Sequence, residues 1–381
     1  MEKLKYKALT FDDVLLLPKY SDFLPSEASI ESKLTKNITL KTPLISAAMD
    51  TVTESKMAIS LAETGGIGII HKNNSIEEQA AQVKAVKKYE SGIVRDPVTI
   101  NSKQSIRELK QLTNELSISG MPVVDDGKLE GIVTSRDFRY AENMDSEVSS
   151  IMTPFEKLIT VEEGFSQEEV MKLMYKNRIE KILVLDTNSN LSGLVTMKDI
   201  EKSAQHPNAT KDSSGRLQVG AALGTSEDTI ERAQALFESG VDVFVVDSAH
   251  GHSKNVIETI KMLKEKFKDV DIIGGNIATA EAATELVRAG ADAVKVGMGP
   301  GSICTTRIIA GIGVPQISAI LEIKKALVGR DINIIADGGI RFSGDIAKAI
   351  AAGADSVMLG SLFAGTEEAP GKVELFQGRS F

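Results

Sequence analysis

Cys304 is the only cysteine of the 381-residue chain, and it lies in a glycine-rich stretch, residues 297–307 (GMGPGSICTTR). A thiol becomes a strong nucleophile when its surroundings favour the thiolate, although most unpaired cysteines are small buried side chains. The glycines allow close approach of the backbone to a ligand, with N–H groups offered to an anion or carbonyl oxygens to a cation. The stretch itself leaves both interpretations open, a nucleophile or a structural cysteine.

Composition restricts the class of protein. The chain carries 44 Lys and Arg against 53 Asp and Glu, a net charge of −9, which argues against nonspecific binding of nucleic acid. A single cysteine excludes an intrachain disulfide and favours a reducing compartment. The amino terminus lacks the apolar run of a signal peptide, and no apolar stretch is long enough to span a membrane. We therefore expect a soluble cytoplasmic protein that binds neither nucleic acid nor membrane.

Eight short apolar runs alternate with helical patterns, several of which end at an Ala-Gly or Ser-Gly pair typical of a helix C-terminus. The runs are 43–50, 67–70, 219–222, 243–246, 271–274, 293–296, 332–336 and 356–359. Eight alternating β/α units predict an α/β TIM barrel. An open doubly wound sheet is the weaker alternative, because no G-x-G-x-x-G opens a helix at the first βα turn.

An internal repeat interrupts this pattern after the second unit. Residues 131–137 (GIVTSRD) recur as residues 193–199 (GLVTMKD), and each copy follows an apolar strand, a polar turn and an amphipathic helix. Two tandem units of one supersecondary type are the simplest account. We expect a discontinuous barrel over 1–91 and 204–381, with an inserted domain over 92–203 that divides into 92–150 and 151–203.

In a TIM barrel the active site lies at the carboxyl ends of the strands, and the loops after strands seven and eight commonly bind phosphate. Those loops carry Asp337-Gly338-Gly339 and Gly360-Ser361. Glycine N–H groups suit a phosphate, and an aspartate beside them suits ribose hydroxyls, which predicts a nucleotide or a sugar phosphate. The alternative is a pair of tight turns that bind nothing. Asp247, His250 and His252 have a spacing that a metal could use, but no matching second group of ligands accompanies them.

Seven stretches carry a resemblance to a known family. They are residues 9–16 (LTFDDVLL), 46–54 (SAAMDTVTE), 65–68 (GGIG), 247–252 (DSAHGH), 299–307 (GPGSICTTR), 337–340 (DGGI) and 360–361 (GS). In these the chain resembles the inosine-5′-monophosphate dehydrogenase and GMP reductase family over essentially its whole length. The repeats resemble the tandem CBS pair that this family inserts into its barrel.

The resemblance implies NAD-dependent oxidation of IMP to XMP, the committed step of guanine nucleotide synthesis, through a covalent thioimidate on Cys304 with Thr306 near the attacking water. It assigns IMP to Ser46, Asn276, Ser302, Asp337, Gly338, Gly339, Gly360 and Ser361. It assigns NAD to Asp247, Ser248, Ala249, Gly297, Met298 and Gly299. Backbone carbonyls of Gly299, Gly301 and Cys304 are implied ligands for K⁺, and a homotetramer is the implied assembly.

The same resemblance implies a regulatory site for ATP or GTP in the repeats, at Thr134 with Asp137 and at Thr196 with Asp199. The family continues beyond residue 381 with a nucleotide-binding stretch and a mobile flap that carries the base for hydrolysis. From this we expect the present sequence to lack the flap and to be impaired in the hydrolytic half-reaction. Two alternatives stay open: a GMP reductase, and a truncated nucleotide sensor without full turnover.

Overall fold

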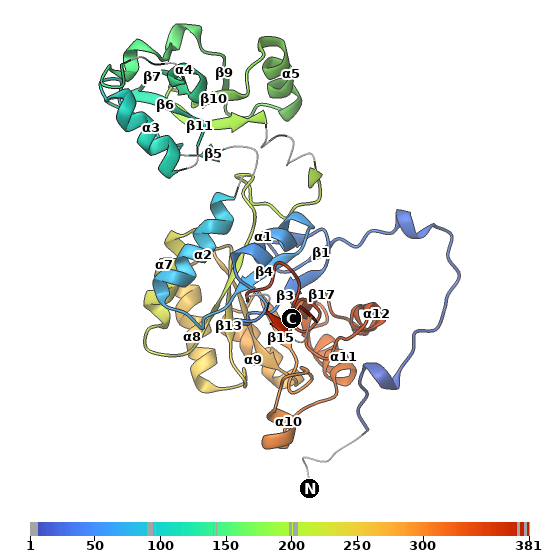
Figure 1. The fold of residues 1–381 in the computed structure, drawn as a ribbon. Coiled ribbons are helices and arrows are strands. Elements are labelled where there is room, and N and C mark those ends of the chain that lie inside the picture. Colours follow the sequence, from blue (N-terminus) through green and yellow to red (C-terminus); the bar gives the residue numbers. More distant parts are fainter. Residues whose placement is uncertain are drawn as a thin grey trace. The chain divides into compact units, whose positions relative to one another are not determined.

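The chain forms two compact units, Met1–Tyr89 together with Asn208–Phe381, and Glu90–Pro207. The computed structural model in Figure 1 describes residues 7–89, 94–95, 97–116, 118–139, 141, 143–197, 200, 205–371, 374–376 and 379–380. Among the helices within those ranges, none is long and apolar enough to cross a membrane.

The first unit is built on eight parallel strands that close into a barrel in the order β12-β13-β14-β15-β16-β17-β3-β4. Their bounds are β3 Leu44–Ser46, β4 Ile67–Ile70, β12 Gly220–Leu223, β13 Val243–Asp247, β14 Asp271–Ile277, β15 Ala293–Val296, β16 Asn333–Asp337 and β17 Ser356–Leu359. The barrel closes because β17 pairs with β3 and β12 pairs with β4, which joins strands on either side of the second unit in sequence. The predicted TIM barrel is confirmed.

The strands alternate between two cores, as the two-residue period of a β-strand requires. In β13, Val243 and Val245 pack inside the barrel, whereas Phe244 and Val246 pack outward under the helices. Apolar side chains of the segment around β1 (Ser32–Lys33) and β2 (Thr39–Leu40) join the inner core, and Thr35 Oγ1 donates to Asp271 Oδ2 at the start of β14, at 2.5 Å. This segment therefore closes the amino-terminal end of the barrel and leaves the carboxyl end for a site.

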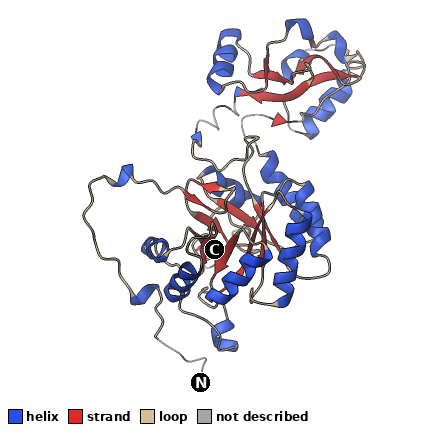
Figure 2. Cartoon of the chain, turned by 180° about the vertical axis from the view of Figure 1, so that it is seen from behind, coloured by secondary structure: helices blue, strands red, loops and turns tan. Residues whose placement is uncertain are grey.

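Helices cover the outside of the barrel in Figures 1 and 2. They are α1 Ser55–Glu63, α2 Ile76–Lys88, α7 Thr229–Glu238, α8 Lys254–Lys266, α9 Ala280–Ala289, α11 Gln316–Ala326 and α12 Ser343–Ala352. A capping box opens α2: the Ser75 hydroxyl accepts from Glu78 N at 3.1 Å, and Ser75 N donates to Glu78 Oε2 at 3.0 Å. Gly290 ends α9 with φ +107° and Gly353 ends α12 with φ +113°, a left-handed conformation that favours glycine.

The amino-terminal segment runs outside the barrel as an extended loop with two short 3-10 helices, η1 Phe11–Asp13 and η2 Pro25–Glu27 (Figure 1). Phe11 is buried, and its carbonyl accepts from Lys348 Nζ at 2.8 Å on α12. Leu9 also exchanges hydrogen bonds with Ser318 on α11. The segment is thus tied to the barrel at its first described residues.

The second unit contains the same arrangement twice. A helix, α3 Ile106–Glu115 or α5 Gln167–Asn177, precedes an antiparallel hairpin. The hairpins pair β6 Gly120–Asp125 with β7 Lys128–Thr134, and β10 Lys181–Leu185 with β11 Leu191–Thr196. The remaining strands of this unit are β5 Val94–Arg95, β8 Thr153–Pro154 and β9 Thr160–Glu162; its short helices are α4 Ser135–Phe138, η3 Val148–Ser150 and η4 Phe155–Lys157.

The barrel unit also contains a short hairpin late in the sequence, in which β18 Leu375–Phe376 pairs with β19 Arg379–Ser380.

A buried ion cluster joins the parts of the barrel unit that flank the second unit in sequence. Lys87, near the end of α2, is 6% exposed, and its Nζ lies 3.0 Å from Asp212 Oδ2 and 2.9 Å from Asp242 Oδ2. Asp242 Oδ2 also accepts from Val219 N at 2.8 Å, just before β12. One ammonium therefore fixes the chain where it leaves the barrel and where it returns.

We expect Lys87→Met to lower the free energy of unfolding of the barrel unit by about 3–5 kcal/mol, because two carboxylates would lose their buried partner. Lys84→Met is the matched control, since Lys84 lies on the exposed face of the same helix and its loss should change stability by less than about 0.5 kcal/mol. Calorimetric melting of both variants measures the difference. Equal melting temperatures for the two variants would contradict a structural role for the cluster.

Candidate active site

The cysteine loop follows β15 and begins in close contact with β16. A Cβ atom at Gly297 would lie 2.0 Å from the Asp337 carbonyl oxygen, so no side chain fits there. Gln316, at the start of α11, links the ends of the same two strands. Its Nε2 donates to the Val296 carbonyl at 2.7 Å and to the Asp337 carbonyl at 3.2 Å. The steric requirement for glycine at 297 therefore places the predicted cysteine loop directly beside the predicted ribose-binding aspartate.

Cys304 lies at the end of this loop, just before the short helix α10 Thr306–Ile309. Its Sγ is 3.3 Å from Thr306 Oγ1, and its N–H donates to the Gly301 carbonyl at 3.1 Å. Hydrogen bonding to the side chain and backbone of Thr306, aided by the positive charge of Arg307, lowers the pKa of the Cys304 thiol. The thiol is only partly buried, so these local contacts outweigh the small opposing effect of burial.

The turn after β16 packs against the cysteine loop. Gly338 and Gly339 both have left-handed φ angles, +87° and +79°. A Cβ at Gly338 would lie 3.1 Å from the Gly301 N atom, and one at Gly339 would lie 3.2 Å from the Pro300 Cβ. The predicted phosphate turn and the cysteine loop therefore form one continuous surface at the barrel mouth.

The turn after β17 lies beside the end of β3. The Ala47 N–H donates to the Leu359 carbonyl at 3.0 Å, and a Cβ at Gly360 would lie 3.3 Å from Met49 Sδ. Ser46 is fully buried, and its Oγ has no hydrogen-bond partner among the described residues. Ser302 and Ser361 are exposed. The structure thus brings the 46–49 segment next to Gly360, while the hydroxyls of Ser302 and Ser361 face solvent.

A buried lysine that the sequence analysis did not select lies at the centre of the mouth. Lys295 of β15 is 3% exposed, and its Nζ donates to Asp247 Oδ1 at 2.8 Å, to Asp337 Oδ2 at 2.8 Å and to Asn276 Oδ1. Asn276 in turn donates from Nδ2 to Asp337 Oδ2 and to the Gly297 carbonyl, each at 2.8 Å. These side chains come from four neighbouring strands, β13 to β16.

The charges of this cluster stabilise one another. Burial alone would lower the pKa of Lys295, but the carboxylates of Asp247 and Asp337 outweigh it and hold the pKa above its usual range. Burial would likewise raise the pKa of Asp247, and the charge of Lys295 overcomes it, so that this pKa lies below its usual range. The lysine is therefore a permanent cation, which excludes it as a general base near neutral pH.

Three residues predicted to bind NAD, Asp247, Ser248 and Ala249, lie at the end of β13 and in the loop that follows it, whereas Gly297, Met298 and Gly299 belong to the cysteine loop. Ser248 N donates to the Gly275 carbonyl at 3.0 Å, and Asn276 N donates to the Ser248 carbonyl at 2.9 Å. Lys72, after β4, donates from Nζ to the Asp247 carbonyl at 2.7 Å. Ala249 and His250 are exposed beyond this anchored point. The Asp247 side chain therefore meets Lys295, whereas Ser248 contacts Gly275 and Asn276 only through its backbone and Ala249 is exposed beyond them.

Two places near the barrel mouth have groups that bear on metal ligation. His252 Nε2 lies 3.0 Å from Glu285 on α9, and Asp247 is bonded to Lys295, so the side chains of the 247–252 loop face different partners. Within the described ranges no three His, Cys, Asp or Glu side chains form a group that could hold a metal ion. In the cysteine loop, Gly299 has φ +82°, and a Cβ at Gly301 would contact only Cys304 Cβ, at 3.5 Å. There is room around Gly301, and its carbonyl accepts from Cys304 N at 3.1 Å.

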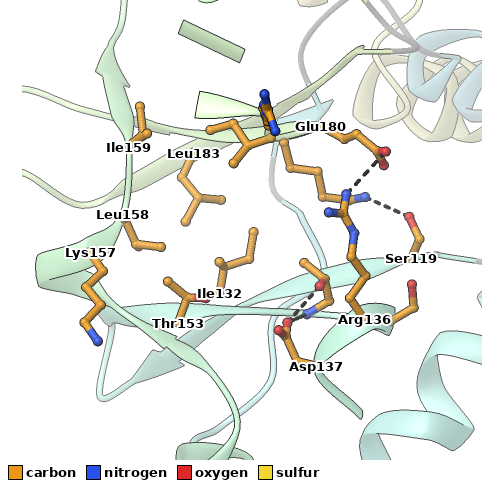
Figure 3. Close-up of a pocket in the computed structure, with 15 residues that line it drawn as sticks. Ser119, Ile132, Arg136, Asp137, Thr153, Lys157, Leu158, Ile159, Glu180 and Leu183 are labelled. Atoms are coloured by element: carbon orange, nitrogen blue, oxygen red, sulfur yellow. Dashed lines mark hydrogen bonds and ion pairs between the residues drawn. The ribbon is translucent and has the colours of Figure 1, made fainter. Parts of the chain in front are cut away.

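The second unit has a cleft of about 270 Å³ lined by both repeats (Figure 3). Thr134 donates to Asp137 Oδ2 from its N–H at 2.6 Å and from its hydroxyl at 2.7 Å. Arg136 Nη2 lies 3.3 Å from Glu180 Oε1. The basic side chains that line the cleft are Arg136, Lys157, Arg178 and Lys181. Thr196 lines a separate pocket of the same unit, and Asp199 falls outside the described residues.

Because Cys304 is the only thiol, its rate of alkylation by iodoacetamide at different pH values reports one ionisation. We expect the thiolate to persist below about pH 8.5, the pKa of an ordinary thiol, and to be lost as the pH falls through the lowered pKa. Thr306→Val removes the hydroxyl contact and should move the midpoint upward. Thr305→Val, one residue away, should leave it in place; identical midpoints for Thr306→Val and the parent chain would contradict the proposed cause.

Comparison with known proteins agrees with this geometry. The model of the IMP dehydrogenase / GMP reductase domain matches residues 8–381. Inosine-5′-monophosphate dehydrogenases of Haemophilus influenzae and Escherichia coli are 55% and 54% identical, over 100% of this chain and 78% of theirs. GMP reductase from Trypanosoma brucei in complex with guanosine 5′-monophosphate superposes with a TM-score of 0.89 at 43% identity, covering 100% of this chain and 81% of that one. Its complex with guanosine 5′-triphosphate gives 0.86 at 44% identity, covering 97% and 90%. The chain therefore belongs to the IMP dehydrogenase and GMP reductase family of oxidoreductases.

Proposed function

We propose that the protein oxidises IMP to XMP with NAD as the hydride acceptor. The observation that carries the proposal is the single thiol of lowered pKa on a loop that packs against the Gly338-Gly339 turn. A nucleophile beside a candidate phosphate turn is the arrangement that covalent chemistry on a nucleotide base requires. Eight relatives at 52–55% identity over 98–100% of this chain are named inosine-5′-monophosphate dehydrogenase, which favours this member of the family.

The proposed reaction has two steps. The Cys304 thiolate adds to C2 of the hypoxanthine ring, and the hydrogen on C2 leaves with its electron pair for the nicotinamide ring, which gives NADH and a thioimidate. Water then adds at C2, one of its protons goes to N3 of the ring and the other to solvent, and the carbon–sulfur bond breaks to release XMP and the thiolate. Thr306, 3.3 Å from the sulfur, is in position to stabilise the thiolate when it forms and when it departs.

In this proposal the two ends of the charged cluster serve different ligands. Asp337 accepts hydrogen bonds from the ribose of IMP while Gly338, Gly339 and Gly360 face its phosphate. Other IMP contacts are assigned to Ser46, Asn276, Ser302 and Ser361. Asp247 and Ser248 serve the nicotinamide ribose of NAD, with Ala249 and the 297–299 backbone beside it. Exposed Ser302 and Ser361 are free to donate to a bound nucleotide.

Two further assignments belong to the proposal. Carbonyl oxygens of Gly299, Gly301 and Cys304 would hold K⁺, which would stabilise the loop conformation around the sulfur; oxygen ligands are those that such a cation takes. The chain would assemble as a homotetramer. Potassium dependence of the activity and the mass of the assembly in solution are the direct measurements.

GMP reductase activity is the second candidate, because the two solved structures reported above are GMP reductases at 43–44% identity. That reaction would use the same thiol and a reduced nicotinamide cofactor, and it would release ammonia. Parallel assays of IMP with NAD and of GMP with NADPH separate the two, since each pair supports only one direction of hydride transfer.

We expect Cys304→Ala to lower the rate of NADH formation from IMP by a factor on the order of 10³ or more, because the covalent step is lost. Binding of IMP should survive, since its phosphate and ribose contacts lie elsewhere. Thr305→Ala is the matched control in the same loop and should retain most of the activity. NADH formation by Cys304→Ala at close to the parental rate would contradict the proposal.

In the second unit we propose a CBS pair that binds ATP or GTP in the cleft of Figure 3. Thr134 and Asp137 are placed at a strand-to-helix junction, where an aspartate suits ribose hydroxyls, and the basic side chains around them suit a triphosphate. Thr196 and Asp199 would form the corresponding site of the second repeat. A guanosine 5′-triphosphate complex of the Trypanosoma brucei relative is consistent with a triphosphate ligand in this family.

Calorimetry with ATP and GTP on the whole chain tests this site. We expect Arg136→Ala to weaken binding by roughly 10-fold or more, because a charge-assisted contact to phosphate is lost. Arg107→Ala is the control, since Arg107 is exposed, pairs with Asp145 and does not line the cleft. Absence of binding by the parent chain, or equal affinities of the two variants, would count against the assignment.

A further inference from the structure

Lys295 connects two carboxylates that the proposed function gives to two different ligands. Its ammonium group has three N–H donors, and the structure uses one for Asp247, one for Asn276 and one for Asp337. None is left for a substrate. Lys295 therefore acts on any ligand only through the groups that it holds.

Each carboxylate keeps one oxygen outside this arrangement. Lys295 engages Oδ1 of Asp247 and Oδ2 of Asp337, and Asn276 also engages Oδ2 of Asp337. In the described part of the chain the second oxygen of each carboxylate accepts no hydrogen bond, and the side chains are 29% and 19% exposed. Both aspartates therefore present one acceptor to the mouth while their other oxygen is fixed on the shared lysine.

Sharing makes the orientations of the two carboxylates interdependent. The lysine side chain is 4% exposed, so solvent cannot replace a contact that weakens, and the pair interacts strongly in this environment. A ligand that fixes Asp337 also fixes the ammonium group, and thereby the position of Asp247. The first ligand to bind then loses the free energy needed to order these three side chains. The second ligand binds to side chains that are already ordered, so its own binding is stronger.

We infer that Lys295 is a positioning residue that couples the two ligand sites, so that binding of the purine nucleotide strengthens binding of the dinucleotide and the reverse. This inference rests on the proposed function, in which Asp337 serves the nucleotide and Asp247 the dinucleotide. The coupling free energy between the nucleotide site and the dinucleotide site is thereby assigned to one buried lysine. Because coupling between binding sites is reciprocal, the effect must be equal in both directions.

The coupling can be measured in the Cys304→Ala background, where both ligands can bind without hydride transfer. Calorimetric titration with IMP, in the absence of NAD and with NAD at saturation, should give affinities that differ by about 5-fold or more. Adding Asp247→Asn, which keeps the size of the side chain and leaves Lys295 paired with Asp337, should remove this difference. It should also weaken IMP measured alone, although Asp247 does not contact IMP, because the lysine moves toward Asp337 and withdraws charge from it.

Two further variants separate coupling from a structural effect. Ser248→Ala, next to Asp247 but outside the lysine cluster, should weaken NAD alone and leave the effect of NAD on IMP intact. Asp337→Asn should weaken NAD measured alone, which is the reciprocal result and stands even if Asp247→Asn does not fold. In the chain that retains Cys304, Asp247→Asn should raise KM for IMP as well as for NAD, whereas Ser248→Ala should raise KM for NAD only.

The outcomes are distinct. IMP affinity that is the same with and without NAD, or an Asp247→Asn variant that keeps the full effect of NAD on IMP, overturns the coupling and leaves the proposed function in place. Failure of the Cys304→Ala chain to bind either IMP or NAD overturns the proposed function, and the coupling with it.

Discussion

The barrel mouth depends on one buried ammonium group that is bonded to side chains of three other strands. A lysine at this position would destabilise the barrel without its partners, because an unpaired charge in such a site costs several kcal/mol. Asp247, Asn276 and Asp337 supply one acceptor each. The strand register aligns Asp247 with Gly275 and Gly275 with Lys295, and Asn276 and Asp337 lie one and two residues beyond that level on their own strands. The cluster carries more carboxylates than cations, so its unused oxygens attract hydroxyl donors. The same cluster thus accounts for the stability of the barrel mouth and for the acceptors that the proposed function assigns to ribose hydroxyls.

The thiol owes its position to steric contact between loops. Gly297 has no room for a side chain against Asp337, and Gly338 and Gly339 lie against Pro300 and Gly301. These contacts fix the start and the middle of the cysteine loop, and the sulfur beyond them stays partly exposed. Reactivity then comes from neighbours in the sequence, Thr306 and Arg307, and not from deep burial. The thiolate is thus stabilised while the sulfur stays accessible, as the proposed covalent step requires.

Much of the fold could be predicted because its signals are local. Alternating apolar runs predicted the eight strands, and the Ala-Gly pairs predicted helix ends that the structure confirms at Gly290 and Gly353. Lys295 was passed over because it interrupts a short apolar run that looks wholly buried. A signal was present: with Val294 and Val296 facing the helices, the two-residue period turns Lys295 to the barrel interior beside Ala293. The partners of Lys87 could not be predicted, since they come from residues more than a hundred positions away.

The central claim, that Cys304 attacks C2 of IMP and that the C2 hydrogen passes to NAD, is tested most directly with IMP deuterated at C2. Mixing it with NAD and the 381-residue chain, followed by mass spectrometry of both the cofactor and the digested protein, follows the hydrogen and the sulfur in one experiment. The account predicts deuterium in the reduced cofactor and a nucleotide adduct on the peptide that contains Cys304. Deuterium that stays on the purine, or a reduced cofactor that takes its hydrogen from elsewhere, would contradict it.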